Sequence, residues 1–173
     1  MKPRAAPPPL TLLPQPLTAA AFAPYGTVIA APPTGAGRAI NGGTTERFEL
    51  VDDLRLDTDG GRAALALFRA QARRFPHAVA EMERHRLGSQ SFVPLGALRF
   101  VVVVAPAGAA PGPGDLAAFR TDGRQGVALA PGIWHHALLA VDAGDFAVVE
   151  RAAARPDCDV HQLPAAVLLP SPG

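Results

Sequence analysis

The sequence has almost no cysteine and no excess of charge of either sign. Cys158 stands alone, which excludes an internal disulfide framework and is typical of a protein from a reducing compartment. The 16 Lys and Arg residues against 15 Asp and Glu leave a formal net charge of +1, which gives no electrostatic basis for binding nucleic acid or an acidic membrane surface. No apolar run approaches the roughly 18 residues that a membrane-spanning helix needs. We therefore expect a cytoplasmic protein with no nucleic-acid partner and no membrane partner.

Aromatic residues are also scarce, whereas proline and glycine are abundant. Aromatics make up 6% of the chain and all hydrophobic residues 49%, so a core must depend mainly on aliphatic side chains. The 19 prolines and 17 glycines fall between apolar runs and interrupt long helices. The length of 173 residues fits one domain. We place that domain at residues 15–164, between a proline-rich N-terminal extension at 1–14 and a C-terminal tail at 165–173.

Short apolar runs recur at intervals of about ten residues with turn residues between them, which predicts an all-β fold of two packed antiparallel sheets. The run "ALRFVVVVAPA" at 97–107 is β-branched and continuous, as in a strand buried on both faces. Further strands are expected at 27–30, 44–50 and 89–95, with two strands around an Asp-Gly turn in 116–132 and two more around "DAGD" in 136–151.

A few short helices are expected as well. Thr18 is a good N-cap for an alanine-rich turn that Pro24 and Gly26 would end. "HAVAEMERH" at 77–85 predicts one or two helical turns, and "RAALALFRA" at 62–70 suits a helix or a strand equally well.

The segment "EMERHRLGSQSFVPLG", residues 81–96, collects side chains that suit a chemical site. It places Glu83, His85 and Gln90 within eight residues, where the chain enters an expected strand. A carboxylate, an imidazole and an amide can orient a substrate, exchange protons with it or hold a divalent ion. A solvated polar face remains the alternative.

The segment "GVALAPGIWHHALL", residues 126–139, carries two adjacent histidines behind a Pro-Gly turn. Adjacent side chains of a strand point to opposite faces, so His135 and His136 should not both line one site. We expect His135 to work in the site and His136 to pack. We read His77 and His161, which lie outside both segments, as surface residues.

Small β-barrels of the cupin type build their pocket from two such segments, the first with His-x-His and an acid, the second with Pro-Gly and a histidine. Here the first motif is degenerate, because Glu83 stands in place of its first histidine and Gln90 in place of its acid. The set Glu83, His85, Gln90 and His135 suits either a metal-free acid–base site or a loosely bound divalent metal. Neither motif requires a cofactor, and the metal-free site and the metal site both remain as alternatives.

Several stretches of the chain, taken together, resemble the bacterial ureidoglycolate lyase family over roughly residues 15 to 164. They are "INGGTTERF", "FRAQAR", "MERHRLGSQSFVPLGALRFVVVVA", "LAAFRTDGRQGVALAPGIWHHALLAV" and "DFAVVERA". The resemblance implies a cupin-like β-barrel that pairs as a homodimer. It also implies a lyase that cleaves ureidoglycolate to glyoxylate and urea in allantoin and purine breakdown.

The chemistry of that substrate suggests roles for particular residues. Cleavage needs a base, an acid and a cation for the substrate's carboxylate, and no nucleophilic serine or cysteine. The expected catalytic residues are His85, His135, Glu83 and Gln90. The expected substrate-binding residues are Arg69, first choice for the carboxylate, Arg99, second choice, Asn41 and Trp134.

Three alternatives remain at this stage. The first is a metal-dependent cupin enzyme that acts on another small acid, which metal analysis would reveal. The second is a non-catalytic barrel that binds a small ligand without turning over ureidoglycolate. The third is a hydrolase on the same substrate, which would release ammonia instead of urea.

Overall fold

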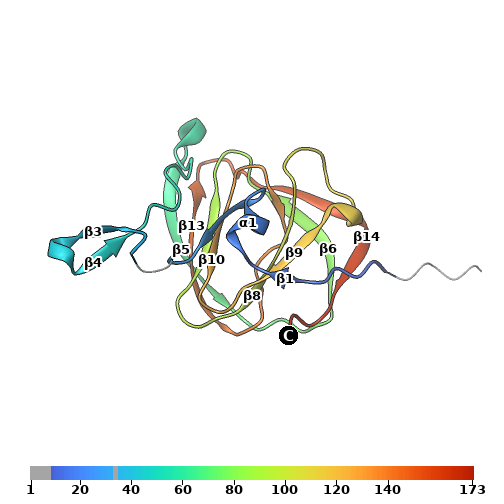
Figure 1. Ribbon diagram of the computed structural model, residues 1–173. Helices are drawn as coiled ribbons and strands as arrows, with labels where there is room; N and C mark the ends of the chain where they lie inside the picture. The colour runs from blue at the N-terminus through green and yellow to red at the C-terminus, as the bar shows by residue number, and fades with distance from the viewer. Residues whose placement is uncertain (1–8, 33–34) are drawn as a thin grey trace, which may run out of the picture.

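Two mainly antiparallel β-sheets packed against each other form the body of the protein (Figure 1). The computed structural model describes residues 9–32 and 35–173. The first sheet contains, in spatial order, β1 (Gln15–Pro16), β9 (Ala117–Arg120), β8 (Phe100–Ala105), β11 (Trp134–His135), β6 (His77–Arg84) and β14 (Asp159–Leu169), and β12 (Leu139–Ala140) also pairs with β8. The second sheet contains β2 (Gly26–Ile29), β10 (Gly126–Leu129), β7 (Gln90–Pro94), β13 (Gly144–Ala152) and β5 (Arg62–Ala70). This architecture confirms the expected all-β, cupin-like fold.

The main core cluster lies between the two sheets. Phe92, Val127 and Phe146 come from the second sheet, and Phe100 and Phe119 come from the first. Four of these side chains are at most 1% exposed, and Phe92 is 5% exposed. The few aromatic residues of the chain are therefore concentrated in the core, where each buries a large apolar area.

Strand β8 is buried on both faces, as its β-branched sequence predicted. Val102 and Val104 belong to the cluster between the sheets. Val101 and Val103 belong to a second cluster on the other face of the first sheet, together with Trp134. Because side chains alternate along a strand, this one run supplies both clusters.

The helix expected after Thr18 is present as α1 (Ala19–Phe22), and the Thr18 hydroxyl accepts a hydrogen bond from the Ala21 N–H at 3.2 Å. Three short 3-10 helices accompany it: η1 (Asn41–Gly43), η2 (Thr58–Gly60) and η3 (Pro113–Asp115). In the part of the chain that the structure describes, no helix has the length and apolar character that a membrane crossing requires.

The helical turns expected at 77–85 are wrong, because His77–Arg84 is strand β6. Alanine, glutamate and methionine favour helix by intrinsic propensity, but β6 pairs with β14 on one side and β11 on the other. Tertiary pairing therefore overrides local preference here. The segment 62–70, for which helix and strand stayed open, is strand β5 and pairs with β13 along its whole length.

The strands expected around the two turns are present but do not form hairpins. Strand β9 pairs with β8, whereas β10 pairs with β2 and β7. Likewise β12 joins the first sheet and β13 the second. The Asp-Gly turn and the "DAGD" turn each carry the chain from one sheet to the other.

The packed body continues past the boundary expected at residue 164. That position falls inside β14, and both Val167 and Leu169 are fully buried. At the other end, Thr11 forms a parallel bridge with Leu168, inside the segment expected to be an extension. The first eight residues of that extension lie outside the described residues.

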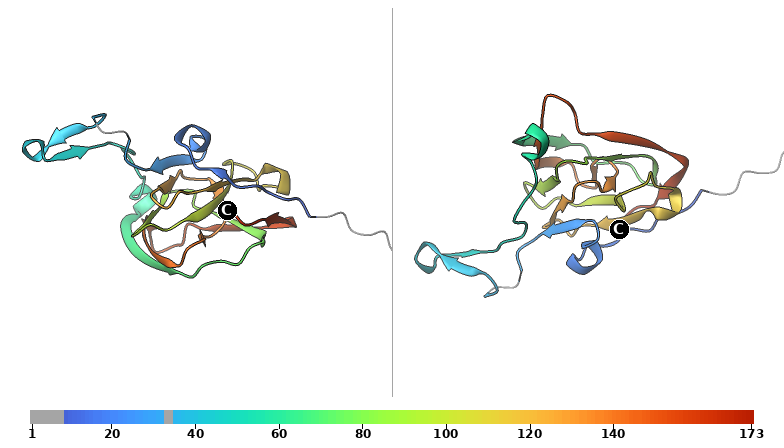
Figure 2. Two further views of the ribbon diagram at one scale, coloured as in Figure 1. Left: turned by 60° about the horizontal axis from the view of Figure 1, so that its bottom comes forward. Right: turned by 90° about the horizontal axis from the view of Figure 1, so that it is seen from above.

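A hairpin of β3 (Arg38–Ile40) and β4 (Thr45–Arg47), which we call the arm, projects from the body in all the views of Figures 1 and 2. Strand β4 covers only the first part of the strand expected at 44–50. The 3-10 helix η1 forms the tip of the arm, and Asn41 begins it with a φ of 53°.

Candidate active site

The segments 81–96 and 126–139 pair twice, through β6 and β11 in the first sheet and through β7 and β10 in the second. His135 of β11 is the register partner of Glu83 of β6, and the rings of His85 and His135 are 5.4 Å apart. The N–H of Gly132 donates a hydrogen bond of 2.6 Å to the carbonyl of His85. Gly132 has a φ of +83°, a left-handed conformation that glycine adopts more readily than other residues. This conformation explains why a glycine follows Pro131 in the turn.

His135 is buried in the barrel, with 2% of its surface exposed. Its Nε2 lies 3.1 Å from Oε1 of Gln90 and 3.5 Å from Oε1 of Glu83. Its Nδ1 lies 3.1 Å from the carbonyl oxygen of Ile133. Each ring nitrogen therefore faces an oxygen acceptor, which suits an imidazole that carries or delivers a proton.

The amide of Gln90 has a fixed orientation because it bridges His135 and Glu150. Its Nε2 donates to Oε2 of Glu150 at 2.8 Å. A carboxylate can only accept, so the NH2 group must face Glu150 and the carbonyl must face His135. Both ends of the Gln90 amide, which was expected among the catalytic groups, are thus engaged within the protein.

Glu83 is partly buried beside the imidazoles. Its pKa is lowered, first because His135 donates a hydrogen bond to the carboxylate, and partial burial opposes this shift. The thiol of Cys158 lies 3.9 Å from Oε2 of Glu83. Partial burial of the sulfur and then the charge of Glu83 raise the pKa of Cys158, so its neutral thiol is favoured.

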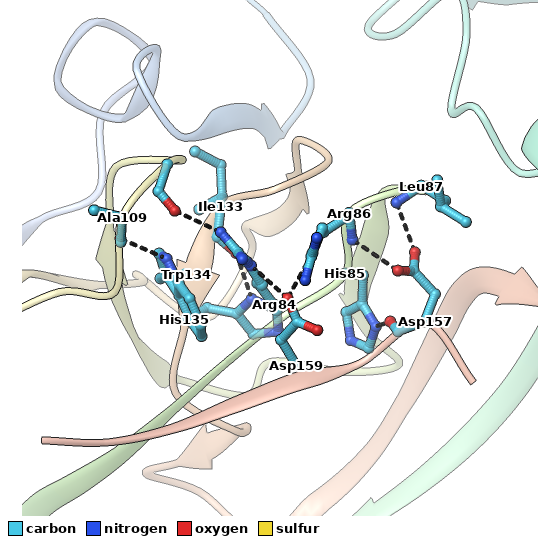
Figure 3. A network of polar contacts seen from close by, with 11 residues as sticks. Arg84, His85, Arg86, Leu87, Ala109, Ile133, Trp134, His135, Asp157 and Asp159 are labelled. Atoms are coloured by element: carbon cyan, nitrogen blue, oxygen red, sulfur yellow. Dashed lines mark hydrogen bonds and ion pairs between the residues drawn. The ribbon is translucent and has the colours of Figure 1, made fainter. Parts of the chain in front are cut away.

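His85 is held by the chain around Asp157 (Figure 3). Its Nδ1 donates to the carbonyl oxygen of Asp157 at 2.5 Å, and the Asp157 carboxylate accepts from the backbone N–H groups of Arg86 and Leu87 at 3.0 and 2.6 Å. The other ring nitrogen, Nε2, is buried and has no hydrogen-bond partner among the described residues. Because Nδ1 carries the hydrogen, Nε2 is left with a free lone pair.

Glu83, His85 and His135 also fit a divalent cation. Each offers one ligand atom, and these atoms all lie within 4.8 Å of one another. A free Nε2 on a histidine whose Nδ1 donates to a backbone carbonyl is the usual arrangement of a ligating imidazole. Gln90 was expected to join such a set, but it contacts His135 and Glu150 instead.

A cavity of about 420 Å³ opens beside Glu83. Its other polar lining residues are Arg73, His77, Glu81, His136 and Gln162. His77 was expected at the surface, but its Nε2 is buried. His135 lies in the cluster, whereas His136, which was expected to pack, lines the cavity.

Three of the expected substrate-binding residues lie apart from the cluster. Arg69 is ion-paired to Asp145 through its Nε and Nη2 atoms, at 2.8 and 3.0 Å. Arg99 pairs in the same way with Asp142, at 2.9 and 3.0 Å. Asn41 sits on the arm, where its Nδ2 donates to Thr45 at 3.3 Å.

Trp134 lies next to the cluster but faces away from it. It belongs to the outer core cluster, its Nε1 donates to the carbonyl of Ala109 at 3.0 Å, and the guanidinium of Arg84 stacks on its ring at 4.3 Å. Alternation along β11 accounts for this, because His135 occupies the inward position.

Sequence reasoning missed Arg73, Glu150 and Asp157. Arg73 ends "FRAQAR" and Glu150 lies in "DFAVVERA", two stretches that carry the family resemblance. No motif spacing marks Asp157, because its contribution depends on where β14 begins.

A fold of two packed sheets in which Glu83 both lines a cavity and belongs to a cluster with two imidazoles defines a cupin-like enzyme site for a small polar molecule. A profile of the family described as Ureidoglycolate lyase matches residues 9–169. A protein of Burkholderia cepacia named ureidoglycolate lyase is 51% identical over 146 residues, covering 83% of this chain and 81% of that protein. A ureidoglycolate lyase of Pseudomonas entomophila (strain L48) is 43% identical over 156 residues, covering 89% and 92%. The chain belongs to the ureidoglycolate lyase family.

Proposed function

We propose that the protein cleaves ureidoglycolate to glyoxylate and urea, as a carbon–nitrogen lyase in the breakdown of allantoin and purines. The family match over residues 9–169 carries this conclusion. The cluster of Glu83, His85 and His135 supplies proton-transfer groups of the kind that the reaction needs.

The reaction moves one proton and breaks one bond. One carbon of ureidoglycolate bears a hydroxyl, a carboxylate and a ureido nitrogen. Removal of the hydroxyl proton lets the carbon–oxygen double bond form, and the carbon–nitrogen bond breaks with its electron pair going to nitrogen. The nitrogen takes up a proton and leaves as urea, so no water is consumed.

The hydrogen bonds of the two histidines support different roles for them. The free Nε2 of His85 is placed to accept the hydroxyl proton, because its Nδ1 is committed to the Asp157 carbonyl. His135 faces acceptors at both nitrogens and suits delivery of a proton to the leaving nitrogen. The Glu83 carboxylate lies 3.5 Å from Nε2 of His135 and also lines the cavity, so it connects the histidine with the cavity. Gln90 orients His135.

The proposal includes a weakly held divalent cation. In that metal-bound form, which is an alternative to the acid–base roles above, Glu83, His85 and His135 would hold the ion, with Nε2 of His135 free of hydrogen, and the ion would polarise an oxygen of the substrate. Metal analysis of the purified protein, followed by removal with a chelator and titration of the apoprotein with divalent ions, tests this point. Binding to the unchanged protein but not to Glu83→Gln would support it, and equal binding by both would contradict it.

Product analysis tests the proposed reaction. Purified protein incubated with ureidoglycolate should release urea and glyoxylate in equal amounts. Ammonia in place of urea would indicate the hydrolase instead. Ligand binding without any turnover would indicate a non-catalytic barrel.

A homodimer and a cytoplasmic location are further parts of the proposal. Strand β5 is an edge strand of nine residues, and Leu65 and Leu67 on it are 75% and 57% exposed. Long edges with apolar side chains favour pairing with another chain, here a second copy. Light scattering should give a dimer mass that Leu65→Glu reduces and the control Leu95→Glu, at a 59% exposed position outside β5, does not. Cell fractionation tests the location.

A further inference from the structure

An arginine near Glu83 is the residue expected to bind the carboxylate of the substrate. This expectation rests on the proposed function, because ureidoglycolate carries a carboxylate on the reacting carbon. A planar guanidinium binds a carboxylate through two parallel hydrogen bonds, which fixes the position of that carbon. A guanidinium already paired in this way with a protein carboxylate is not free for the substrate.

Both arginines that the sequence suggested are already occupied. Arg69 and Arg99 each form a two-nitrogen ion pair with a neighbouring aspartate. In both pairs the side-chain hydrogen bonds from the arginine, and to a smaller extent its charge, lower the pKa of the aspartate, so the partners are ionised near neutral pH. Neither arginine lines the cavity beside Glu83.

Arg73 differs from these two in place and in pairing. It lies between β5 and β6 and is the arginine that lines the cavity together with Glu83. Its backbone N–H donates to the carbonyl of Ala140 at 2.8 Å, which ties this part of the loop to the first sheet. Within residues 9–32 and 35–173, its guanidinium makes no ion pair with a carboxylate.

Among the residues that line the cavity beside Glu83, Arg73 carries the permanent positive charge. The guanidinium of Arg73 is always protonated, whereas burial, and then the charges of His136 and Arg73, lower the pKa of His77, so the His77 ring is neutral at pH 7. Glu83, and Glu81 at the cavity edge, supply oxygen acceptors. A cavity with one cation and carboxylate acceptors fits a molecule with a carboxylate at one end and hydroxyl and N–H donors at the other.

We propose that Arg73 binds the substrate's carboxylate and so presents the reacting carbon to Glu83, the member of the Glu83–His85–His135 cluster that lines the cavity. A ligand held between Arg73 and Glu83 would place its anionic end on the cation and its donors on the carboxylate. The exposed guanidinium of Arg73 would become enclosed on binding, which strengthens the charge-assisted hydrogen bonds.

Steady-state kinetics of Arg73→Ala, Arg73→Lys and the matched control Arg74→Ala test the assignment. Arg74 is adjacent and exposed, and it does not line the cavity with Glu83. We expect Arg73→Ala to raise the KM for ureidoglycolate at least tenfold, with kcat changed less, and Arg73→Lys to restore part of the loss because charge remains without the fork. Arg74→Ala should keep the KM within twofold. Equal effects of the two alanine variants, or an unchanged KM in Arg73→Ala, would overturn the assignment.

Direct binding of glyoxylate separates this inference from the proposed function. Glyoxylate binding, measured by NMR titration, should be present in the unchanged protein and at least tenfold weaker in Arg73→Ala. If that holds but ureidoglycolate is not cleaved, the proposed reaction fails and the role of Arg73 stands. If cleavage occurs and Arg73→Ala binds glyoxylate normally, Arg73 is the wrong residue. Absence of both cleavage and binding in the unchanged protein overturns both.

Discussion

Glu150 of β13 lies directly opposite Gln90 of β7, and its carboxylate accepts a 2.8 Å hydrogen bond from the Gln90 amide. This contact decides which end of the amide faces His135. Because Gln90 then presents its carbonyl at 3.1 Å, Nε2 of His135 must carry a hydrogen. Glu150 thus sets the hydrogen-bonding state of His135, the histidine that we propose to be catalytic, without contacting it.

Replacing Glu150 by glutamine should therefore impair catalysis without removing a proposed catalytic residue. A glutamine can donate as well as accept, so Gln90 is no longer held in one orientation. We expect kcat to fall by about tenfold or more, as for other groups that orient a functional histidine, with KM changed little. The matched control is Glu49→Gln, an exposed position beside Arg47 near the arm. An unchanged kcat in Glu150→Gln would show that the amide orientation does not matter.

Replacing His135 by glutamine should lower kcat for urea release by roughly 100-fold or more, in the range that acid–base groups contribute. His161→Gln is the control, because that ring contacts Trp134 and the Pro111 carbonyl at the outer face instead. Circular dichroism should show that both variants keep the β-sheet fold. Activity within a few-fold of the unchanged protein would remove His135 from the mechanism.

Arg69→Lys distinguishes the sequence-based expectation from the structure. The sequence predicts a raised KM, because Arg69 was the first choice for the substrate's carboxylate. In the structure this side chain is 78% exposed and paired with Asp145. We therefore expect the KM of Arg69→Lys to stay within twofold, and a large increase would return Arg69 to the site.

The protonation of His77 should reduce stability in mild acid. Its folded-state pKa is lowered from 6.5, first by burial and then by the charges of His136 and Arg73. The unfolded chain then binds the proton more readily, so this contribution to stability is present above pH 6.5 and lost as the pH falls below it. NMR titration should give His77 a pKa below 6.5, and Arg73→Gln should raise it towards that value. No change in Arg73→Gln would place the guanidinium away from His77.

Gly132→Ala should destabilise the turn whose Gly132 N–H donates a hydrogen bond to the carbonyl of His85. Gly132 has a φ of +83°, and an added Cβ would meet only ordinary contact with Ala107 at 3.5 Å, so the cost is backbone strain. We expect a loss of about 1–2 kcal/mol in the free energy of unfolding, measured in urea. Gly114→Ala, at a position with open space around it, is the control and should change stability less.

The strands that could be predicted were those whose side chains alone decide the structure. The β-branched run of β8 and the Thr18 cap needed no tertiary information. Strand β6 could not be predicted in this way, because Val79 and Met82 are both fully buried and lie three residues apart, as on a helix face. Its conformation is decided by β11 and β14, which are distant in sequence.

The site shows the same division. That His85 and His135 would meet could be predicted from the two motif segments, since each motif places its histidine locally. Which arginine is free could not be predicted, because Asp145 and Asp142 occupy Arg69 and Arg99 only once distant segments pair. Charge pairing across a sheet leaves no periodic mark in the sequence.

Strand β14 has a consequence for how the site is completed during synthesis. Strand β6, which carries Glu83, lies between β11 and β14 in the sheet, and β14 ends at Leu169. A ribosome must therefore translate as far as Leu169 before β6 gains its complete outer neighbour, and as far as Asp157 before His85 gains its hydrogen-bond partner. Nascent chains that stall earlier should be inactive, however well the rest of the barrel has formed.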